Sequence, residues 1–543
     1  MRGSFGEPVI PCVLFEDEHL LVVDKPAGVN THAPSPYAGE GLYDWLHHRE
    51  PRWATLAILH RLDKETSGVL VFGKTAVANR ALTEQFTQRR VTKKYLLLTD
   101  RPVPRREFTV KSTLARRGET YASRPGGEPA ETHFRVIETR AGLTLVEAEP
   151  RTGRTHQIRV HAAESGLPIL GDTLYGGTAA ERVFLHAAEL HCAHPETGKP
   201  CGFRSRADFG FPERAAALPM ALARRRALVD PTETNALRLI HGASDGRPGW
   251  QVEQLGRFLL SQTEDPLTPA QREQLATWCR VTGAQGAYHK RLNRQVRRTA
   301  AGEASPQLVL GDAAPERFEI RENGLRFELS FSEGYSVGLF LDQRDNRRRL
   351  LTGHVAAGFP LLRAATQTPP AELLNCFAYT CGFSVSAARA GLRTTSLDLS
   401  KKYLDWGRRN FALNGLDTTA HDFIFGDTFD WLKRFAKKGR AFDVVVLDPP
   451  TFSQSKASGV FRVEKDYGKL VTAALAVLKP DGVLLASTNA ADWAPEAFVA
   501  AVRSAAQAAG RKLTQVHYVP QPLDFPITRA EPGYLKTWWL RLA

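Results

Sequence analysis

The spacing of apolar residues changes along the chain, and this change limits the folds that the chain can adopt. Before about residue 212, strand-like runs such as HLLVVDKPAG, SGVLVFGK and KKYLLLTD follow one another between glycine and proline turns. From about residue 319 onward, apolar runs such as ELLNCF, DVVVLD and GVLLAS alternate with helical stretches. Alternation of strands and helices favours a parallel, doubly wound sheet. The two halves of the chain therefore predict two different folds.

A chain of 543 residues is too long for one hydrophobic core. We predict a first domain over residues 1–212 and a linker over residues 213–233, which is rich in alanine and arginine and can be partly helical. A small α/β domain over residues 234–318 and a doubly wound α/β domain over residues 319–543 follow.

The net charge of +14 and the pI near 9.6 favour a polyanionic partner, because counterion release would supply much of the affinity. Charge alone does not distinguish RNA from DNA or from an anionic membrane. No apolar run approaches the roughly 20 residues that span a bilayer, and the first residues do not resemble a signal peptide. We therefore expect a cytoplasmic protein that does not enter a membrane.

The six cysteines are too few for a disulfide framework. Cys192 and Cys201 lie in HCAHPETGKPC beside His191 and His194, a pattern open to a zinc site or to a loop between strands. Zinc ligands usually come as two closely spaced pairs, and this segment has no second pair. We expect no bound metal here.

Two segments of the first domain carry candidate catalytic residues. HRLDKETSGVLVFGK, residues 60–74, places Asp63 in a polar turn at a strand end, with Arg61 two positions away. The second segment, residues 149–172, contains five basic side chains: Arg151, Arg154, His156, Arg159 and His161. From the residues alone, an aspartate with such a cluster fits either an ion-paired structural turn or a phosphate-binding active site.

HRLDKETSG and RTGRTHQIRVHA closely resemble the signature segments of the large-subunit rRNA pseudouridine synthases of the RluA type. LVVDKPAGVNTH, KKYLLL and FLHAAELHCAHPETG are similar to other motifs of that family, and the last explains the His/Cys cluster without zinc. The resemblance covers about residues 8–212. It implies an α+β domain with a mixed sheet and an isomerisation that needs no cofactor.

The same resemblance implies roles for four residues. Asp63 would be the catalytic carboxylate that allows the C–N bond of uridine to break and the base to re-attach through C5. Arg159 would form an ion pair with Asp63 and keep it ionised. Tyr95 would stack on the ring and assist removal of the C5 proton. Arg61 would fill the space left by the flipped uridine.

In the second half, polar residues follow successive predicted strands. ELLNCF leads into AYTCGFSVSAARAG, a strand–turn–helix unit with Gly382 at the turn, although the usual GxG spacing is missing. Asp398 follows the next strand and could hold the ribose hydroxyls of a nucleoside cofactor. Asp427 follows the third strand, where it could face an adenine amine or cap a helix.

DPPTF follows the strand FDVVVL, at the edge where parallel sheets bind ligands. Asp448 and the backbone carbonyls of Pro449 and Pro450 could hold a nitrogen of a base, and Phe452 could stack on the base. A purely structural Pro-Pro turn is the alternative, which the two preceding cofactor strands make less attractive.

Residues from about 234 to 543 resemble the large-subunit rRNA methyltransferases of the RlmI and RlmK types. The resemblance implies a small RNA-binding α/β domain, a Rossmann-like class I methyltransferase domain and S-adenosylmethionine as cofactor. GLFLDQRDNRR, with Asp342 and Gln343, is similar to the segment that covers the cofactor there. LLNCFAYTCGF is similar to that family's first motif, which implies cofactor contacts from Asn375, Phe377, Tyr379 and Gly382.

The methylated atom is harder to predict. Methylation of cytosine C5 needs a thiolate, but the strand after DPP reads VLLASTNAADW and has no cysteine. Cys376 and Cys381 lie in the cofactor loop instead. DPPTFSQSK and the region of Asn489 are more similar to the guanine-N7 branch, in which a ring nitrogen attacks the methyl group directly.

These patterns predict a bifunctional rRNA-modifying enzyme that makes pseudouridine and methylates a nucleobase, with guanine N7 preferred. Its expected partner is large-subunit rRNA or a precursor particle. Two alternatives stay open: the same chemistries on tRNA, and an RNA-binding assembly factor with one inactive module. The sequence does not predict the oligomeric state.

Overall fold

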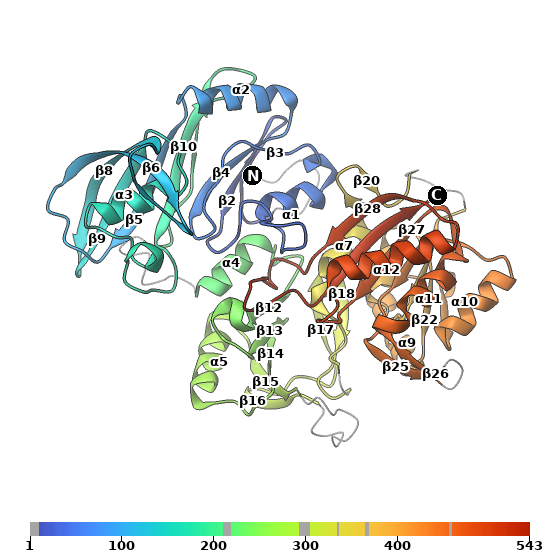
Figure 1. Cartoon of the computed structure of the whole chain (residues 1–543). Coiled ribbons are helices and arrows are strands. Elements are labelled where there is room, and N and C mark those ends of the chain that lie inside the picture. The colour runs from blue at the N-terminus through green and yellow to red at the C-terminus, as the bar shows by residue number, and fades with distance from the viewer. Residues whose placement is uncertain (1–9, 210–218, 293–304, 334–335, 364–368, 456–458) are drawn as a thin grey trace. The chain divides into compact units, whose positions relative to one another are not determined.

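The computed structural model of the protein describes residues 10–209, 219–292, 305–333, 336–363, 369–455 and 459–543. The chain divides into two compact units (Figure 1). The first comprises residues 1–34, 40–47 and 55–230, and the second comprises residues 35–39, 48–54 and 231–543. Among the described residues, none of the helices combines the length and the apolar character needed to cross a bilayer.

An eleven-stranded mixed sheet is the framework of the first unit (Figure 1). Its order is β1-β2-β4-β10-β5-β9-β8-β6-β7, with β3 on β4 and β11 on β10. Only β4 and β10 run parallel among the strand pairs described in this sheet. The strands are β1 (Val13–Glu16), β2 (Leu20–Lys25), β3 (Ala57–Ile58), β4 (Ser67–Gly73), β5 (Thr92–Thr99), β6 (Glu107–Arg117), β7 (Thr120–Ser123), β8 (Glu128–Arg140), β9 (Leu143–Pro150), β10 (Leu185–Ala193) and β11 (Pro200–Arg204).

In the described part of this unit, these strands are accompanied by the α-helices α1 (Leu42–Arg49), α2 (Ala76–Thr87), α3 (Gln157–Glu164) and α4 (Met220–Leu228) and by the short helix η2 (Thr173–Tyr175). The hydroxyl of Thr75 accepts a hydrogen bond from the Ala78 N–H and so caps the start of α2. Leu82 of α2 packs on Val69 and Val71 of β4 in one apolar core. Because β4 is buried along its whole length, the turn before it is held in place.

The segment predicted as a linker, residues 213–233, lies partly outside the described residues. Its described part contains the whole of α4, in which Leu222, Arg225 and Leu228 are buried. The backbone N–H of Cys12 donates to the carbonyl of Ala227 at 2.8 Å. Through residue 230 the described part of this segment therefore packs within the first unit as a helix, because its apolar and arginine side chains have buried contacts there.

The second unit contains two larger sheets. A five-stranded sheet has the order β12-β13-β14-β15-β16, and α5 (Pro269–Thr282) joins its two parallel strands, β14 and β15. The strands of this sheet and of the hairpin after it are β12 (Ala236–His241), β13 (Gln251–Leu255), β14 (Phe258–Thr263), β15 (Gly286–Arg291), β16 (Gln307–Gly311), β17 (Phe318–Glu322) and β18 (Leu325–Leu329).

The seven-stranded sheet has the order β23-β22-β21-β24-β27-β29-β28. The first five strands of this order are parallel, and β29 and β28 are antiparallel to their neighbours. The strands are β21 (Glu372–Cys376), β22 (Arg393–Asp398), β23 (Asp422–Phe425), β24 (Phe442–Leu447), β27 (Leu478–Thr488), β28 (Leu513–Val519) and β29 (Lys536–Leu542). This parallel core confirms the Rossmann-like fold class predicted from the alternating pattern.

The remaining elements of this unit connect or cover the seven-stranded sheet. The helices are η6 (Leu341–Gln343), α7 (Arg344–Thr352), α8 (Gly382–Arg389), α9 (Lys401–Leu413), α10 (Thr428–Lys437), α11 (Val463–Leu475) and α12 (Pro495–Ala508). Two short hairpins pair β19 (His354–Ala356) with β20 (Phe359–Pro360) and β25 (Phe452–Ser455) with β26 (Gly459–Arg462).

Apolar side chains explain why the parts predicted as separate domains, residues 234–318 and 319–543, fall in one compact unit. Phe258 and Leu260 of β14 share a core with Phe318, Leu339 and residues of α8 and α9. Two further cores lie on the two faces of the seven-stranded sheet, because successive residues of each strand point to opposite faces.

Candidate active sites

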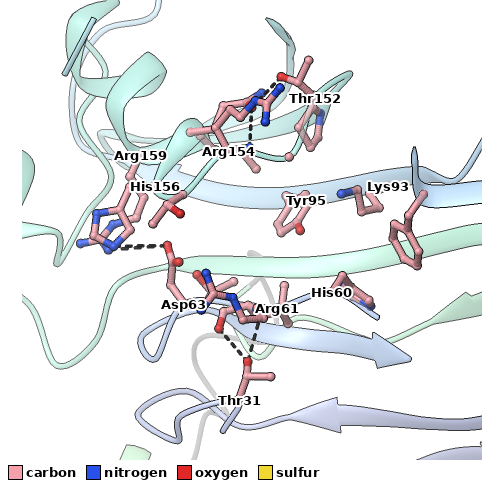
Figure 2. A pocket seen from close by; sticks show the side chains of 18 of the residues that line it. Thr31, His60, Arg61, Asp63, Lys93, Tyr95, Thr152, Arg154, His156 and Arg159 are labelled. Carbon is pink, nitrogen blue, oxygen red and sulfur yellow. Dashed lines mark hydrogen bonds and ion pairs between the residues drawn. The ribbon is translucent and has the colours of Figure 1, made fainter. Parts of the chain in front are cut away.

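A cavity of about 850 Å³ opens in the first unit (Figure 2). It is lined by the turn before β4, by β5 and by the loop that leads into α3. Four side chains that the sequence predicted as catalytic line it together: Arg61, Asp63, Tyr95 and Arg159. The fold therefore brings both signature segments to one pocket.

Asp63 stands beside a buried arginine that has another strong partner. Its Oδ2 is 3.6 Å from Nη1 of Arg159 (Figure 2). Nε and Nη2 of Arg159 each donate to the carboxylate of Asp172 at 2.7 Å. Asp172 is 1% exposed and Arg159 5%, so the two charges neutralise each other out of water. Asp172 therefore holds the guanidinium in a fixed orientation toward Asp63.

His156 also lies close to Asp63. It precedes α3 in a left-handed conformation, with φ 56° and ψ 15°, which is uncommon for a residue other than glycine. Its Nδ1 lies 2.7 Å from the hydroxyl of Tyr175, and its Nε2 lies 3.9 Å from Oδ2 of Asp63. Burial lowers the pKa of His156. A neutral imidazole is thus held next to the carboxylate.

Tyr95 and His60 give the cavity uncharged rings. Burial raises the pKa of Tyr95, and the charge of Asp63 raises it further, so the phenol keeps its proton at neutral pH. A protonated phenol is suited to stacking and poorly suited to removing a proton from carbon. Burial lowers the pKa of His60 to about 3, and its ring stacks on Phe86 with centroids 4.9 Å apart.

Basic side chains surround the opening of the cavity. Arg61 is exposed on the same turn as Asp63. Other basic residues of the lining come from different elements: Arg89, Lys93, Arg151 and Arg154. Arg151 and Arg154 form partly exposed ion pairs, which are weak in water and can give way to phosphates. This arrangement suits a polyanionic substrate.

In the second unit, the loop after β21 takes the place of a glycine-rich turn. Phe377, Tyr379 and Cys381 have φ values of 61°, 48° and 65°, the left-handed region that glycine usually occupies. Gly382, which the sequence placed at the turn, is instead the first residue of α8. A Cβ there would lie 3.0 Å from Cδ1 of Leu339. Glycine is therefore favoured at this position by close packing and not by a need for a left-handed backbone.

Asp398 ends β22 and is held against this loop. Its carboxylate accepts hydrogen bonds from the N–H groups of Tyr379 and Ser400, both at 2.8 Å. Burial raises the pKa of Asp398, and these hydrogen bonds counteract the rise. A fixed acceptor at the end of a parallel strand fits a ribose with two hydroxyl groups.

Asp448 lies at the end of β24 and is joined to two other elements. Nε2 of Gln343 donates to Oδ1 of Asp448 at 3.1 Å and to Oγ of Ser487 at 2.8 Å. Nδ2 of Asn346 donates to Oε1 of Gln343 at 2.7 Å, which fixes the orientation of that amide. Burial, together with the charge of Asp342, raises the pKa of Asp448 to about 7.

Other predicted residues have hydrogen-bond partners within the second unit. The hydroxyl of Tyr534 donates to Asp342 at 2.8 Å. Asp427 caps α10 by accepting from the N–H of Asp430 at 3.1 Å, the alternative role considered for it. Asn375 is fully buried and donates to Ser384, and its Oδ1 has no hydrogen-bond partner among the described residues.

The DPPTF segment carries a partly exposed aromatic ring four positions after Asp448. Pro449 is buried and Pro450 is exposed. Phe452 begins β25 and is 43% exposed. A partly exposed aromatic ring of this kind can stack on a base.

Sequence reasoning missed Asp172 as part of the first site, although it selected the arginine that Asp172 holds. The signal was present, because a buried arginine needs an acidic partner and Asp172 closes the apolar run GLPILGD. Ser487 lies in the segment VLLASTNAADW, where the sequence analysis noted only that it is not a cysteine. Its contact with Gln343 joins residues 144 positions apart, so no local pattern shows it.

Comparisons with known proteins identify both parts of the chain. A family model described as S-adenosylmethionine-dependent methyltransferase matches residues 262–536, about half of the chain. A ribosomal RNA large subunit methyltransferase from Deinococcus radiodurans is 34% identical over 340 residues, which cover 60% of this chain and 78% of the relative. The chain belongs to this methyltransferase family. A model described as RNA pseudouridylate synthase matches residues 19–164, so the methyltransferase also carries a pseudouridine synthase domain.

Two further comparisons agree with this assignment. Ribosomal RNA large subunit methyltransferase I from Klebsiella pneumoniae is 32% identical over 340 residues, which cover 62% of this chain and 80% of the relative. A methyltransferase solved in complex with SAH has a TM-score of 0.50 and 27% identity, over 63% of this chain and 85% of that one. The pseudouridylate synthase model confirms the predicted isomerase class, and the methyltransferase model and relatives confirm the predicted methyltransferase class.

Proposed function

We propose that this methyltransferase is a bifunctional enzyme that modifies large-subunit rRNA, converting one uridine to pseudouridine and methylating guanine at N7. The observation that carries the proposal is that one chain brings predicted site residues together in two places, around Asp63 and around Asp448. The names of the relatives, which are ribosomal RNA large subunit methyltransferases, support rRNA as the substrate.

In the first site, a flipped uridine enters the cavity and faces the ionised carboxylate of Asp63. The bond between C1′ and N1 breaks, the base turns, the bond between C1′ and C5 forms, and C5 loses its proton while N1 gains one. Arg159, 3.6 Å from Asp63, orients the carboxylate, and Tyr95 stacks on the ring. Arg61 is placed to enter the space that the uridine leaves. The pocket needs no cofactor for this isomerisation.

In the second site, the residues at the strand ends fit S-adenosylmethionine, which supplies an electrophilic methyl group when bound. Asp398 would hold the ribose, and the loop from Phe377 to Cys381 would offer its backbone to the rest of the cofactor. Asp448 and Gln343 would hold the polar edge of the base, on which Phe452 would stack.

Guanine N7 is favoured because its lone pair is available without loss of a proton, so positioning suffices. A cysteine mechanism for cytosine C5 has little support in this site. Burial raises the pKa of Cys381 to about 12 and raises that of Cys376 strongly. Neither thiol would ionise readily to attack a base.

Identification of the methylated nucleoside tests the choice of atom. Unmodified large-subunit rRNA is incubated with the protein and labelled cofactor, digested to nucleosides and separated against standards. We expect the label in 7-methylguanosine. Label in 5-methylcytidine or in N2-methylguanosine would overturn the choice of N7 while leaving the methyltransferase assignment intact.

Replacing Asp398 by alanine is expected to weaken S-adenosylmethionine binding by about 10- to 100-fold, because charge-assisted hydrogen bonds to the ribose are lost. Isothermal titration calorimetry measures this change. Asp417→Ala is the matched control, because Asp417 likewise accepts a backbone N–H, that of Thr419 at 2.9 Å, but lies at another helix start. Equal affinity in the Asp398 variant and the wild type would remove Asp398 from the cofactor site.

The pKa of about 7 for Asp448 predicts a pH dependence of methyl transfer. The carboxylate form accepts hydrogen bonds from the base, and this form becomes dominant as the pH rises through 7. We therefore expect kcat/KM at pH 8 to exceed that at pH 6 by about tenfold. In Asp448→Asn this step in kcat/KM between pH 6 and pH 8 should vanish, because asparagine does not titrate. A step of the same size in that variant would assign the titration to another group.

A further inference from the structure

Two cysteines that belong to neither candidate site stand side by side on β10 and β11. Cys192 and Cys201 are direct partners in the antiparallel register, and their Sγ atoms are 3.3 Å apart. Neither residue lines the cavity that holds Asp63. Among the described residues, no group of three or more His, Cys, Asp or Glu side chains could hold a metal ion.

We propose that Cys192 and Cys201 form a reversible disulfide when the protein meets a peroxide. This would be a modification site separate from both modification chemistries of the enzyme. The contact joins strands whose pairing is unbroken from Glu189 to Ala193, so the two side chains stay opposite each other.

The backbone already allows the bond. Two positions along the ladder, the N–H of His194 donates to the carbonyl of Lys199 at 2.8 Å. Hydrogen-bonded pairs alternate in an antiparallel ladder, so Cys192 and Cys201 form a pair of the same kind. Cα atoms in such pairs lie about 5.5 Å apart, within the range of about 4.4–6.8 Å found for disulfides. The sulfurs need to approach each other by only about 1.2 Å more.

The two thiols are suited to different steps of the reaction. Cys201 is half-buried and Cys192 is buried. The hydrogen bond between the two thiols lowers the pKa of Cys201, and the nearby His194 lowers it further. Cys201 is therefore the thiol that ionises and is reached from solvent, and Cys192 is placed behind it to complete the bond.

The reaction balances with hydrogen peroxide as the oxidant. The Cys201 thiolate attacks one peroxide oxygen, the O–O bond breaks, and a sulfenic acid and hydroxide form, the latter taking a proton to become water. The Cys192 sulfur then attacks the Cys201 sulfur, the S–O bond breaks, and a second water leaves with the Cys192 proton. Together the two thiols lose two electrons and two protons, and the peroxide becomes two molecules of water.

The position of the pair connects it to the elements around the first site. Gln85 of α2 donates to the carbonyl of Ala193 at 2.9 Å and accepts from its N–H at 2.8 Å, directly beside Cys192. On its other side β10 pairs with β5, where Ala187 lies opposite Tyr95. A disulfide here would therefore tie β11 to a strand that is already anchored on both sides.

Thiol counting on the full-length protein tests the proposal. Of six thiols, four should remain after treatment with hydrogen peroxide at about equimolar ratio, and a digest should contain the peptides of Cys192 and Cys201 joined by a bond that dithiothreitol breaks. In Cys201→Ser no joined peptides should form, whereas Cys279→Ser should still lose two thiols. Six thiols after treatment, a bond between other cysteines, or a bond between two chains would overturn the proposal.

Discussion

Asp63→Asn is expected to lower kcat for pseudouridine formation by about 10⁴-fold or more, while methyl transfer continues at the wild-type rate. Asparagine keeps the shape of the side chain but carries no charge, so it cannot act as the carboxylate or pair with Arg159 at 3.6 Å. Chromatography of the nucleosides from treated rRNA measures both products in one sample. Because each product comes from its own site, the two should change independently.

Asp208→Asn provides the matched control for this variant. Asp208 also pairs with a buried arginine of the first unit, Arg182, at 2.9 Å, but it does not line the cavity. We expect this control to make pseudouridine at close to the wild-type rate. Retention of pseudouridine formation by Asp63→Asn would show that another residue is the catalytic carboxylate.

Asp172→Ala is expected to destabilise the first unit by about 3–5 kcal/mol, because it leaves the charge of Arg159 buried without its bidentate partner. The remaining contact to Asp63 is longer, so it compensates only in part. Pseudouridine formation should also fall, since Arg159 would no longer hold a fixed orientation. Urea denaturation gives the stability, and nucleoside analysis gives the activity.

The double variant Asp172→Ala/Arg159→Met distinguishes two causes of the lost stability, the unpaired buried charge of Arg159 and the loss of packing. Methionine fills much of the arginine volume without a charge, so we expect the double variant to be more stable than Asp172→Ala alone. It should nevertheless form no pseudouridine at a measurable rate, because Asp63 has lost its partner. If both variants were equally unstable, the Asp172 contact would matter for packing and not for charge.

The sequence was most informative for residues whose role depends on the neighbouring residues of their own segment. The motif around Asp63 and the arginines before Asp172 predicted the chemistry of the first site, and alternating strands and helices predicted the parallel sheet. Contacts made across the fold were not predictable. The bidentate pair of Arg159 with Asp172 depends on how α3 and the following loop turn back, which no periodicity describes.

In the second unit, too, local patterns were predictable from the sequence and contacts between distant residues were not. The positions of Asp398 and Asp448 at strand ends followed from the pattern, but the contact of Gln343 with Asp448 joins residues 105 positions apart. Gly382 was predicted at the turn before α8, but it is the first residue of that helix and does not have the left-handed conformation. Phe377, Tyr379 and Cys381 adopt it instead, held in part by the hydrogen bond from Tyr379 to Asp398.

Nucleoside analysis of unmodified large-subunit rRNA, incubated with the purified protein with and without S-adenosylmethionine, tests the proposed bifunctional enzyme most directly. Pseudouridine has the same mass as uridine, so chromatography or chemical tagging must separate them. We expect pseudouridine in both samples and 7-methylguanosine only in the sample with the cofactor. Absence of both products from free rRNA and from ribosomal precursor particles would contradict the proposal that this protein modifies ribosomal RNA.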